Sequence, residues 1–104
     1  MSGKIYSTTV KFETEFDDVT MKDGKFISEF DLIIEGKLTT NKKSPDEYDD
    51  YIFEVITAKG WDGELQEDIA DVYVQEIIKR EEEIIHDEAI DKAPDRYTWE
   101  VINA

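Results

Sequence analysis

The side chains of this sequence with the greatest capacity for chemistry are its carboxylates. The chain of 104 residues carries 27 Asp and Glu against 12 Lys and Arg, for a net charge of -15. Between Trp61 and Asp91 there are twelve acids and only two bases, Lys79 and Arg80. Carboxylates can bind hard metal ions, transfer protons or present negative charge to a basic partner, and their spacing distinguishes these roles.

The spacing predicts neither a metal site nor a catalytic centre. The sequence has no Asp-x-Asp-x-Asp-Gly calcium loop with a distal glutamate. It has no cysteine, and its one histidine, His86, cannot build a His-rich metal site. None of its four serines lies in a Gly-x-Ser-x-Gly motif. We therefore expect a protein that is not an enzyme, with no catalytic residues, no metal and no cofactor.

The acids instead suggest a charged surface on a helix. Residues 64–91 contain no glycine or proline, and Pro94 stops the helical pattern, so they predict one long helix. The net charge of -10 from Trp61 to Asp91 corresponds to one charge per about 4.6 Å of helix axis. A single strand of B-form DNA carries one charge per about 3.4 Å. A groove that binds DNA or RNA would accept such a helix electrostatically, although a solvated helix face explains the same charge run.

A second acidic group, Asp46, Glu47, Asp49 and Asp50, is interleaved with Tyr48 and Tyr51. Such a group can bind a basic groove while the rings add contact area. Its first residues also fit simple initiation of a turn or helix at Ser44-Pro45. The acids predicted to bind a partner are Asp46, Glu47, Asp49, Asp50, Glu64, Glu67, Asp68, Asp71, Glu81, Glu82, Glu83, Asp87 and Glu88.

The elements that must position these acids begin with a β-hairpin. Residues 4–16 and 25–38 alternate between apolar and polar side chains, and on the second strand Phe26, Ser28 and Phe30 are expected to share one face. A loop of three residues, Lys22-Asp23-Gly24, places Phe16 opposite Phe30, whereas a two-residue loop would oppose Phe16 to an aspartate. We predict the three-residue loop, with Gly24 in the left-handed conformation.

The remaining segments are less uniform. Residues 44–49 predict a turn that leads into a third strand, with a helix over 45–58 as the alternative. Gly60-Trp61-Asp62-Gly63 reads as a junction just before the long helix. The apolar stripe of that helix shifts round its axis, so the helix should bend, break near Lys79-Arg80 or bury two faces, which would permit a homodimer. Residues 96–102 predict a short final strand.

These elements predict a single α+β domain over residues 1–104. Its antiparallel sheet is built on the N-terminal β-hairpin and packs against one long acidic helix in the C-terminal half. Residues 1–43 have a net charge of -1 and form a near-neutral scaffold, whereas residues 44–104 have a net charge of -14. The second half is therefore expected to be the working surface.

The charge predicts a basic nucleic-acid-binding protein as the partner, and no direct binding to nucleic acid or to a membrane, because both are anionic. No secretory signal or apolar span is apparent, so we expect a cytoplasmic protein, in the host cytoplasm if it is phage-encoded. The expected function is that of a small non-enzymatic inhibitor that mimics nucleic-acid charge. It resembles, in kind, phage-encoded DNA mimics that antagonise restriction, CRISPR or repair enzymes. The alternative is an acidic assembly or adaptor domain that binds a protein or itself through the apolar helix surface around Val74, Ile78 and Ile85.

Overall fold

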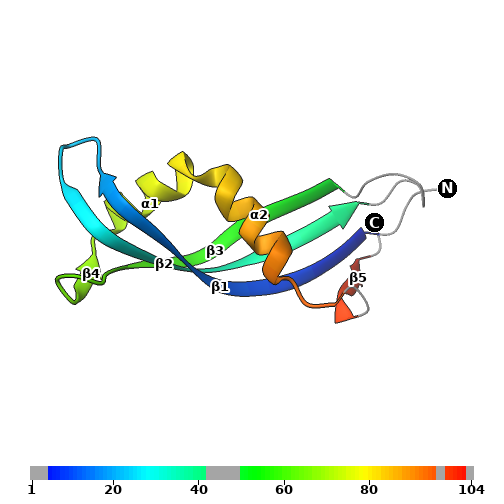
Figure 1. Ribbon diagram of the computed structural model, residues 1–104. Coiled ribbons are helices and arrows are strands. Elements are labelled where there is room, and N and C mark those ends of the chain that lie inside the picture. Colours follow the sequence, from blue (N-terminus) through cyan, green and yellow to red (C-terminus); the bar gives the residue numbers. More distant parts are fainter. Residues whose placement is uncertain (1–4, 42–49, 96–97, 103–104) are drawn as a thin grey trace.

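A computed structural model describes residues 5–41, 50–95 and 98–102. It shows an α+β fold in which five antiparallel strands form one curled sheet and two helices cover one of its faces (Figure 1). The strands lie in the order β4-β3-β2-β1-β5. In chain order the elements are β1 (Ile5–Thr20), β2 (Phe26–Asn41), β3 (Asp50–Asp62), β4 (Glu67–Ile69), α1 (Asp71–Arg80), α2 (Glu82–Lys92) and β5 (Glu100–Ile102).

The register predicted for the N-terminal hairpin is confirmed. Phe16 lies opposite Phe30, and this register continues to the turn. There the backbone N–H of Met21 donates to the carbonyl oxygen of Lys25 at 2.8 Å, which leaves three residues in the loop. Gly24 has a φ of 95°, a conformation that glycine adopts without steric cost. The requirement that apolar residues face each other across the two strands was therefore sufficient to predict the turn length.

The predicted alternation is wrong at the end of β2 that adjoins this turn. Phe26 was expected on the face of Phe30, but it is 57% exposed, whereas Ile27 is fully buried. The buried positions change from even to odd numbers where Asp18, opposite this stretch on β1, adopts a φ of 53°. Beyond Asp18, Val19 is buried as well. A left-handed residue interrupts the two-residue period, and alternation alone does not reveal it.

The segment with two interpretations is a strand. β3 pairs with β2 along its length, so the helix predicted as the alternative over 45–58 is wrong for the described part of that range. A β-bulge at Ile56 shifts the register between Glu35 and Gly36. Trp61 lies within β3, opposite Asp31, and not at a junction before a helix.

The single helix predicted over residues 64–91 is also wrong at its start. The carboxylate of Asp62 accepts hydrogen bonds from the backbone N–H groups of Glu64 and Leu65, each at 3.0 Å. These bonds stabilise a turn that returns the chain as β4, which pairs with the last residues of β3. Helix α1 begins only at Asp71, because an Asp side chain upstream offers the backbone a turn in place of a helix.

The helical segment divides into α1 and α2 at Glu81, beside the predicted break at Lys79-Arg80. The division allows both helices to cover the sheet, with Val74 and Ile77 of α1 and Ile85 and Ala89 of α2 buried in one core. The helix surface predicted for assembly, around Val74, Ile78 and Ile85, is therefore the face that packs on the sheet. That part of the alternative is wrong, because the sheet already occupies this surface.

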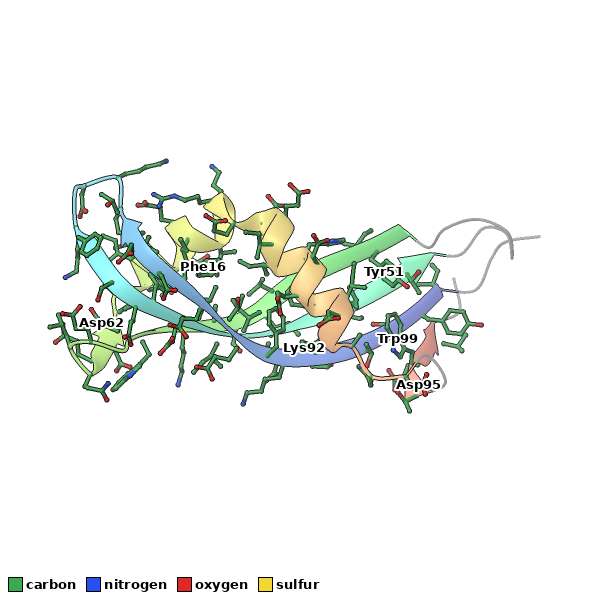
Figure 2. All side chains as sticks on the ribbon, viewed as in Figure 1. Phe16, Tyr51, Asp62, Lys92, Asp95 and Trp99 are labelled. Carbon is green, nitrogen blue, oxygen red and sulfur yellow. The ribbon has the colours of Figure 1, made fainter. Side chains whose placement is uncertain are left out.

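The final strand is shorter than predicted: β5 comprises Glu100–Ile102 and pairs with the first residues of β1. Trp99 precedes it and is buried. Its indole N–H donates to the carbonyl oxygen of Pro94 at 2.9 Å, and its ring packs edge-on against Tyr51 (Figure 2). Trp99 thus closes the end of the core beyond α2.

Candidate functional site

The structure separates the acids predicted to bind a partner. Asp46, Glu47 and Asp49 lie outside the described residues, and of Asp50 only the backbone, at the start of β3, is described. The described acids occupy the β3–β4 turn (Glu64), β4 (Glu67 and Asp68), the start of α1 (Asp71), the helix junction (Glu81) and α2 (Glu82, Glu83, Asp87 and Glu88). They do not form one stripe along one helix axis.

The estimate of helical charge density is therefore wrong, because its acids belong to two strands, the turn between them, two helices and the junction of these helices. Several also have local partners. Glu64 accepts a hydrogen bond from the hydroxyl of Ser28. Glu82 and Glu83 lie in the first turn of α2, where carboxylates interact favourably with the positive end of the helix dipole.

A denser group of acids lies on the sheet face that the helices leave uncovered. We define the acidic face as Glu15 and Asp17 of β1, Glu29 and Asp31 of β2, Trp61 of β3 and Asp68 of β4. The intervening residues of β2, such as Phe30 and Leu32, point into the core against the helices. Alternation along each strand thus places these acids together on the opposite side.

The strand register orders the acidic face into rows. Glu15 lies opposite Asp31, Asp31 opposite Trp61, and Trp61 opposite Asp68, so one row crosses four strands. Asp17 lies opposite Glu29 in the next row. Directly opposed residues have Cβ atoms about 4.5–5.5 Å apart, so the paired carboxylates are close neighbours.

The proximity of these carboxylates changes their electrostatics. The pKa of Glu15 is raised above its ordinary value of 4.5. The largest cause is a side-chain hydrogen bond with Asp17, followed by the negative charges of Asp17, Asp31 and Glu29. Like charges on adjacent positions disfavour ionisation, so the carboxyl of Glu15 is harder to ionise than that of an isolated glutamate.

Counter-charges do not neutralise the acidic face. Within the described ranges, no Lys, Arg or His side chain forms a salt bridge with any of its acids. Lysines do occur on the same side of the sheet, where Lys11 lies opposite Glu35 and Lys37 opposite Glu54. Lys59 lies opposite Ile33, in the row next to Asp31 and Trp61. Opposite charges thus face each other directly in the Lys11–Glu35 and Lys37–Glu54 pairs, whereas like charges face each other in the Glu15–Asp31 and Asp17–Glu29 pairs.

Gly63 fixes the edge of this surface. Its backbone N–H donates to the carbonyl oxygen of Glu29 at 3.0 Å. A Cβ atom at this position would collide with the carboxylate of Glu29 and approach that of Asp31 to 3.3 Å. A glycine therefore allows the β3–β4 turn to pass beside the two carboxylates without displacing them.

His86 has a structural hydrogen bond. Its Nε2 atom lies 2.8 Å from the carbonyl oxygen of Tyr51 in β3, so this nitrogen carries the proton in that contact. The side chain is half-buried on α2. Across residues 5–41, 50–95 and 98–102, no three His, Asp or Glu side chains come together as metal ligands would.

Reasoning from the sequence missed the acidic face because it summed charge along the chain. The near-neutral total of residues 1–43 includes lysines such as Lys22 and Lys25, which lie at the hairpin turn and are not part of the acidic face. The predicted register contained the needed signal, since pairing Phe16 with Phe30 also pairs Glu15 with Asp31. Net charge per sheet face would have identified the surface.

Comparisons with known proteins assign this chain to no family. No protein-family model, no curated protein and no solved structure matches this chain. None of the helices in the described residues is both long enough and apolar enough to span a bilayer. The geometry and charge of the acidic face are therefore the features that point to a function.

Proposed function

We propose that this protein is a non-enzymatic inhibitor that mimics nucleic-acid charge and occupies the DNA- or RNA-binding groove of a basic protein. The observation that carries the proposal is the acidic face, in which Glu15, Asp17, Glu29 and Asp31 lie in two adjacent rows without a salt-bridge partner in the part of the chain that the structure describes. A surface on which these described acids gather without a salt-bridge partner is suited to receive cations from outside.

The spacing of these charges supports this class of partner. The two rows lie two residues apart, about 6.8 Å along the hairpin. Within β1 and β2 each row holds two acids, and Asp68 of β4 is a third acid in the longer row. The four hairpin acids therefore correspond to one charge per about 3.4 Å of strand axis over these two rows, which is comparable to the spacing along a single strand of B-form DNA. The molecule is also elongated, with extents of 52 × 22 × 19 Å, which suits a groove.

Trp61 adds a contact of a different kind. It is half-buried and lies between Asp31 and Asp68 in the longest row. A Trp ring can stack against the guanidinium groups that commonly contact nucleic acid. The acids predicted from the sequence on β4 and α2 extend the negative surface around the molecule and remain candidates for the rim of the interface.

The test uses two variants of equal charge change. In one, Glu15→Gln, Asp17→Asn, Glu29→Gln and Asp31→Asn neutralise the acidic face. In the other, Glu82→Gln, Glu83→Gln, Asp87→Asn and Glu88→Gln neutralise the same number of charges on α2. Partners are captured from lysate with the tagged wild-type protein in a salt series and are challenged with duplex DNA or structured RNA.

We expect the wild-type protein to capture a nucleic-acid-binding protein that elutes at high salt and is displaced by added nucleic acid. The acidic-face variant should capture less of this partner than the α2 variant does. Circular dichroism should show both variants folded. Captured partners that resist both salt and nucleic acid, and that bind the two variants equally, would contradict the proposal and favour the assembly-domain alternative.

A further inference from the structure

A groove lies between the two helices and strand β3. Both helices pack against β3 on the covered side of the sheet (Figure 1). The groove has a volume of about 400 Å³, and its apolar lining consists of Phe53 and Val55 of β3, Ile78 of α1 and Ile85 of α2. Sites for small molecules are concave and mainly apolar, with volumes of about 300–1,000 Å³ and a few polar groups that orient the ligand. This groove has those properties.

His86 attaches one wall of the groove to the other. It lines the groove from α2, and its Nε2 atom donates a hydrogen bond of 2.8 Å to the carbonyl oxygen of Tyr51 in β3. Beside it, Ile85 is only 2% exposed and anchors the same helix in the core. The groove is therefore bounded by elements that are fixed relative to each other before a ligand binds, and such pre-organisation lowers the cost of binding.

The rim of the groove carries one base and one acid. Lys79 lies in the last turn of α1 and Glu82 in the first turn of α2, on either side of Glu81, where the helices divide. Both side chains are exposed. Among the residues that the structure describes, neither forms a salt bridge, whether with the other or with a third side chain. The ammonium of Lys79 and the carboxylate of Glu82 are therefore both available to a ligand.

The two rim charges restrict the charge of the ligand. A ligand whose only charge is a carboxylate would be attracted by Lys79 but repelled by Glu82 and by the negative potential of a chain with net charge -15. A ligand whose only charge is an ammonium would be repelled by Lys79. A ligand that carries both groups, and so has no net charge, complements both side chains and is not repelled by the rest of the molecule.

We propose that this groove binds a free α-amino acid with an apolar side chain. The side chain of the ligand packs on Phe53 and Ile78, its carboxylate accepts a hydrogen bond from Lys79, and its ammonium donates one to Glu82. Each charge-assisted hydrogen bond spans about 2.7–2.9 Å, so a ligand with both charged groups on one carbon can bridge two side chains that do not reach each other. This inference does not rest on the proposed function, because the acidic face lies on the other side of the sheet.

The test is an NMR titration of the isotope-labelled full chain with L-leucine and L-phenylalanine. Two further probes, isoamylamine and isocaproate, keep the side chain of leucine but lack its carboxylate and its ammonium, respectively. We expect both amino acids to shift the methyl resonances of Val55, Ile78 and Ile85 in a saturable manner. Each leucine analogue should bind about two- to fivefold more weakly than leucine, the effect of losing one exposed ion pair.

Variants at the rim test which side chain recognises which group of the ligand. Lys79→Gln should bind leucine and isoamylamine with equal affinity, because the ligand carboxylate has then lost its partner. Glu82→Gln should likewise bind leucine and isocaproate with equal affinity. A merely structural role of either residue would leave these affinity ratios unchanged. Lys92→Gln and Glu88→Gln remove the same charges from α2 outside the groove and should keep the ratios of the wild-type protein.

Three results would overturn the proposal. The first is the absence of saturable shifts at Val55, Ile78 and Ile85 up to the solubility limits of leucine and phenylalanine. The second is an analogue that binds the wild-type protein as tightly as leucine does. The third is a set of affinity ratios that Lys79→Gln and Glu82→Gln leave unchanged, because the rim would then not recognise the charged groups. These titrations contain no partner protein, so their failure is distinct from failure of the nucleic-acid mimic.

Discussion

The hydroxyl of Tyr73 in α1 donates a hydrogen bond of 2.5 Å to the carboxylate of Asp23 in the β1–β2 turn. The Lys25 ammonium lies 5.8 Å from the centre of the same ring. Nearby, Glu76 accepts a hydrogen bond from the backbone N–H of Lys22 and forms a salt bridge with Arg80. The turn of the hairpin is thus attached to a helix that lies fifty residues further along the chain.

Tyr73→Phe should lower the melting temperature at neutral pH and raise the pKa of Asp23 towards its ordinary value of 3.8. In the folded protein this pKa is lowered, first by the hydrogen bond from Tyr73 and then by that from the Lys25 backbone. The carboxyl resonance of Asp23 in an NMR titration measures the pKa directly. Asp23→Asn removes the same charge–dipole contact and serves as the comparison. An unchanged Asp23 pKa in Tyr73→Phe would contradict this assignment.

Stability should change with pH in two opposite directions. Because the pKa of Glu15 is raised above 4.5, the folded state binds a proton before the unfolded state does, and stability from Glu15 increases as pH falls from neutral towards 4.5. Because the pKa of Asp23 is lowered, its contribution is present above about 3.8 and is lost as pH falls through the lowered value.

Glu15→Gln isolates the first of these effects. The variant should be more stable than the wild-type protein at neutral pH, because it removes repulsion from Asp17, Asp31 and Glu29. The difference in melting temperature should shrink as pH falls towards 4.5. Thermal unfolding followed by circular dichroism measures it, and a difference that stays constant over this range would show that Glu15 is not the titrating group.

Gly36→Ala should destabilise the fold by about 1–3 kcal/mol, the usual cost of overfilling a packed core. A Cβ atom on Gly36 would lie 2.5 Å from both the Glu54 carbonyl oxygen and the Phe53 ring. Denaturant unfolding gives the free energy. Thr57→Ala, on the exposed side of β3, is the control and should change stability little. If the two variants unfolded alike, the close packing at Gly36 would not be present in solution.

Trp99→Ala should cost about 3–5 kcal/mol, the range for removing a buried large aromatic side chain. Trp99→Phe should cost less, since it keeps the contact with Tyr51 and loses the hydrogen bond to Pro94. The emission of this indole should also be blue-shifted relative to that of Trp61. Fluorescence of the two single-Trp variants, with the other Trp replaced by Phe, measures both. Equal emission maxima would contradict the burial of Trp99.

Local patterns in the sequence determined much of the scaffold. Alternation and the need to oppose Phe16 to Phe30 were enough for the register and turn length of the hairpin. The shift of the apolar stripe near Lys79-Arg80 indicated a break, and the helices divide at Glu81. The hairpin register, the turn length and the helix break depend on residues close in sequence or on the pairing of two adjacent strands. They can therefore be predicted from the sequence.

Only the tertiary structure decided which side chains come together on each surface of the protein. A strand and a helix were both compatible with residues 50–58 until pairing with β2 selected the strand, because partners distant in sequence supply the hydrogen bonds. Asp62 diverted the chain into β4 where helical propensity predicted a helix. Most of all, the acids were predicted to gather on a helix by their spacing in sequence. Folding gathered Glu15 and Asp31 on a sheet face instead, since the distance between charges is set by strand pairing and not by position along the chain.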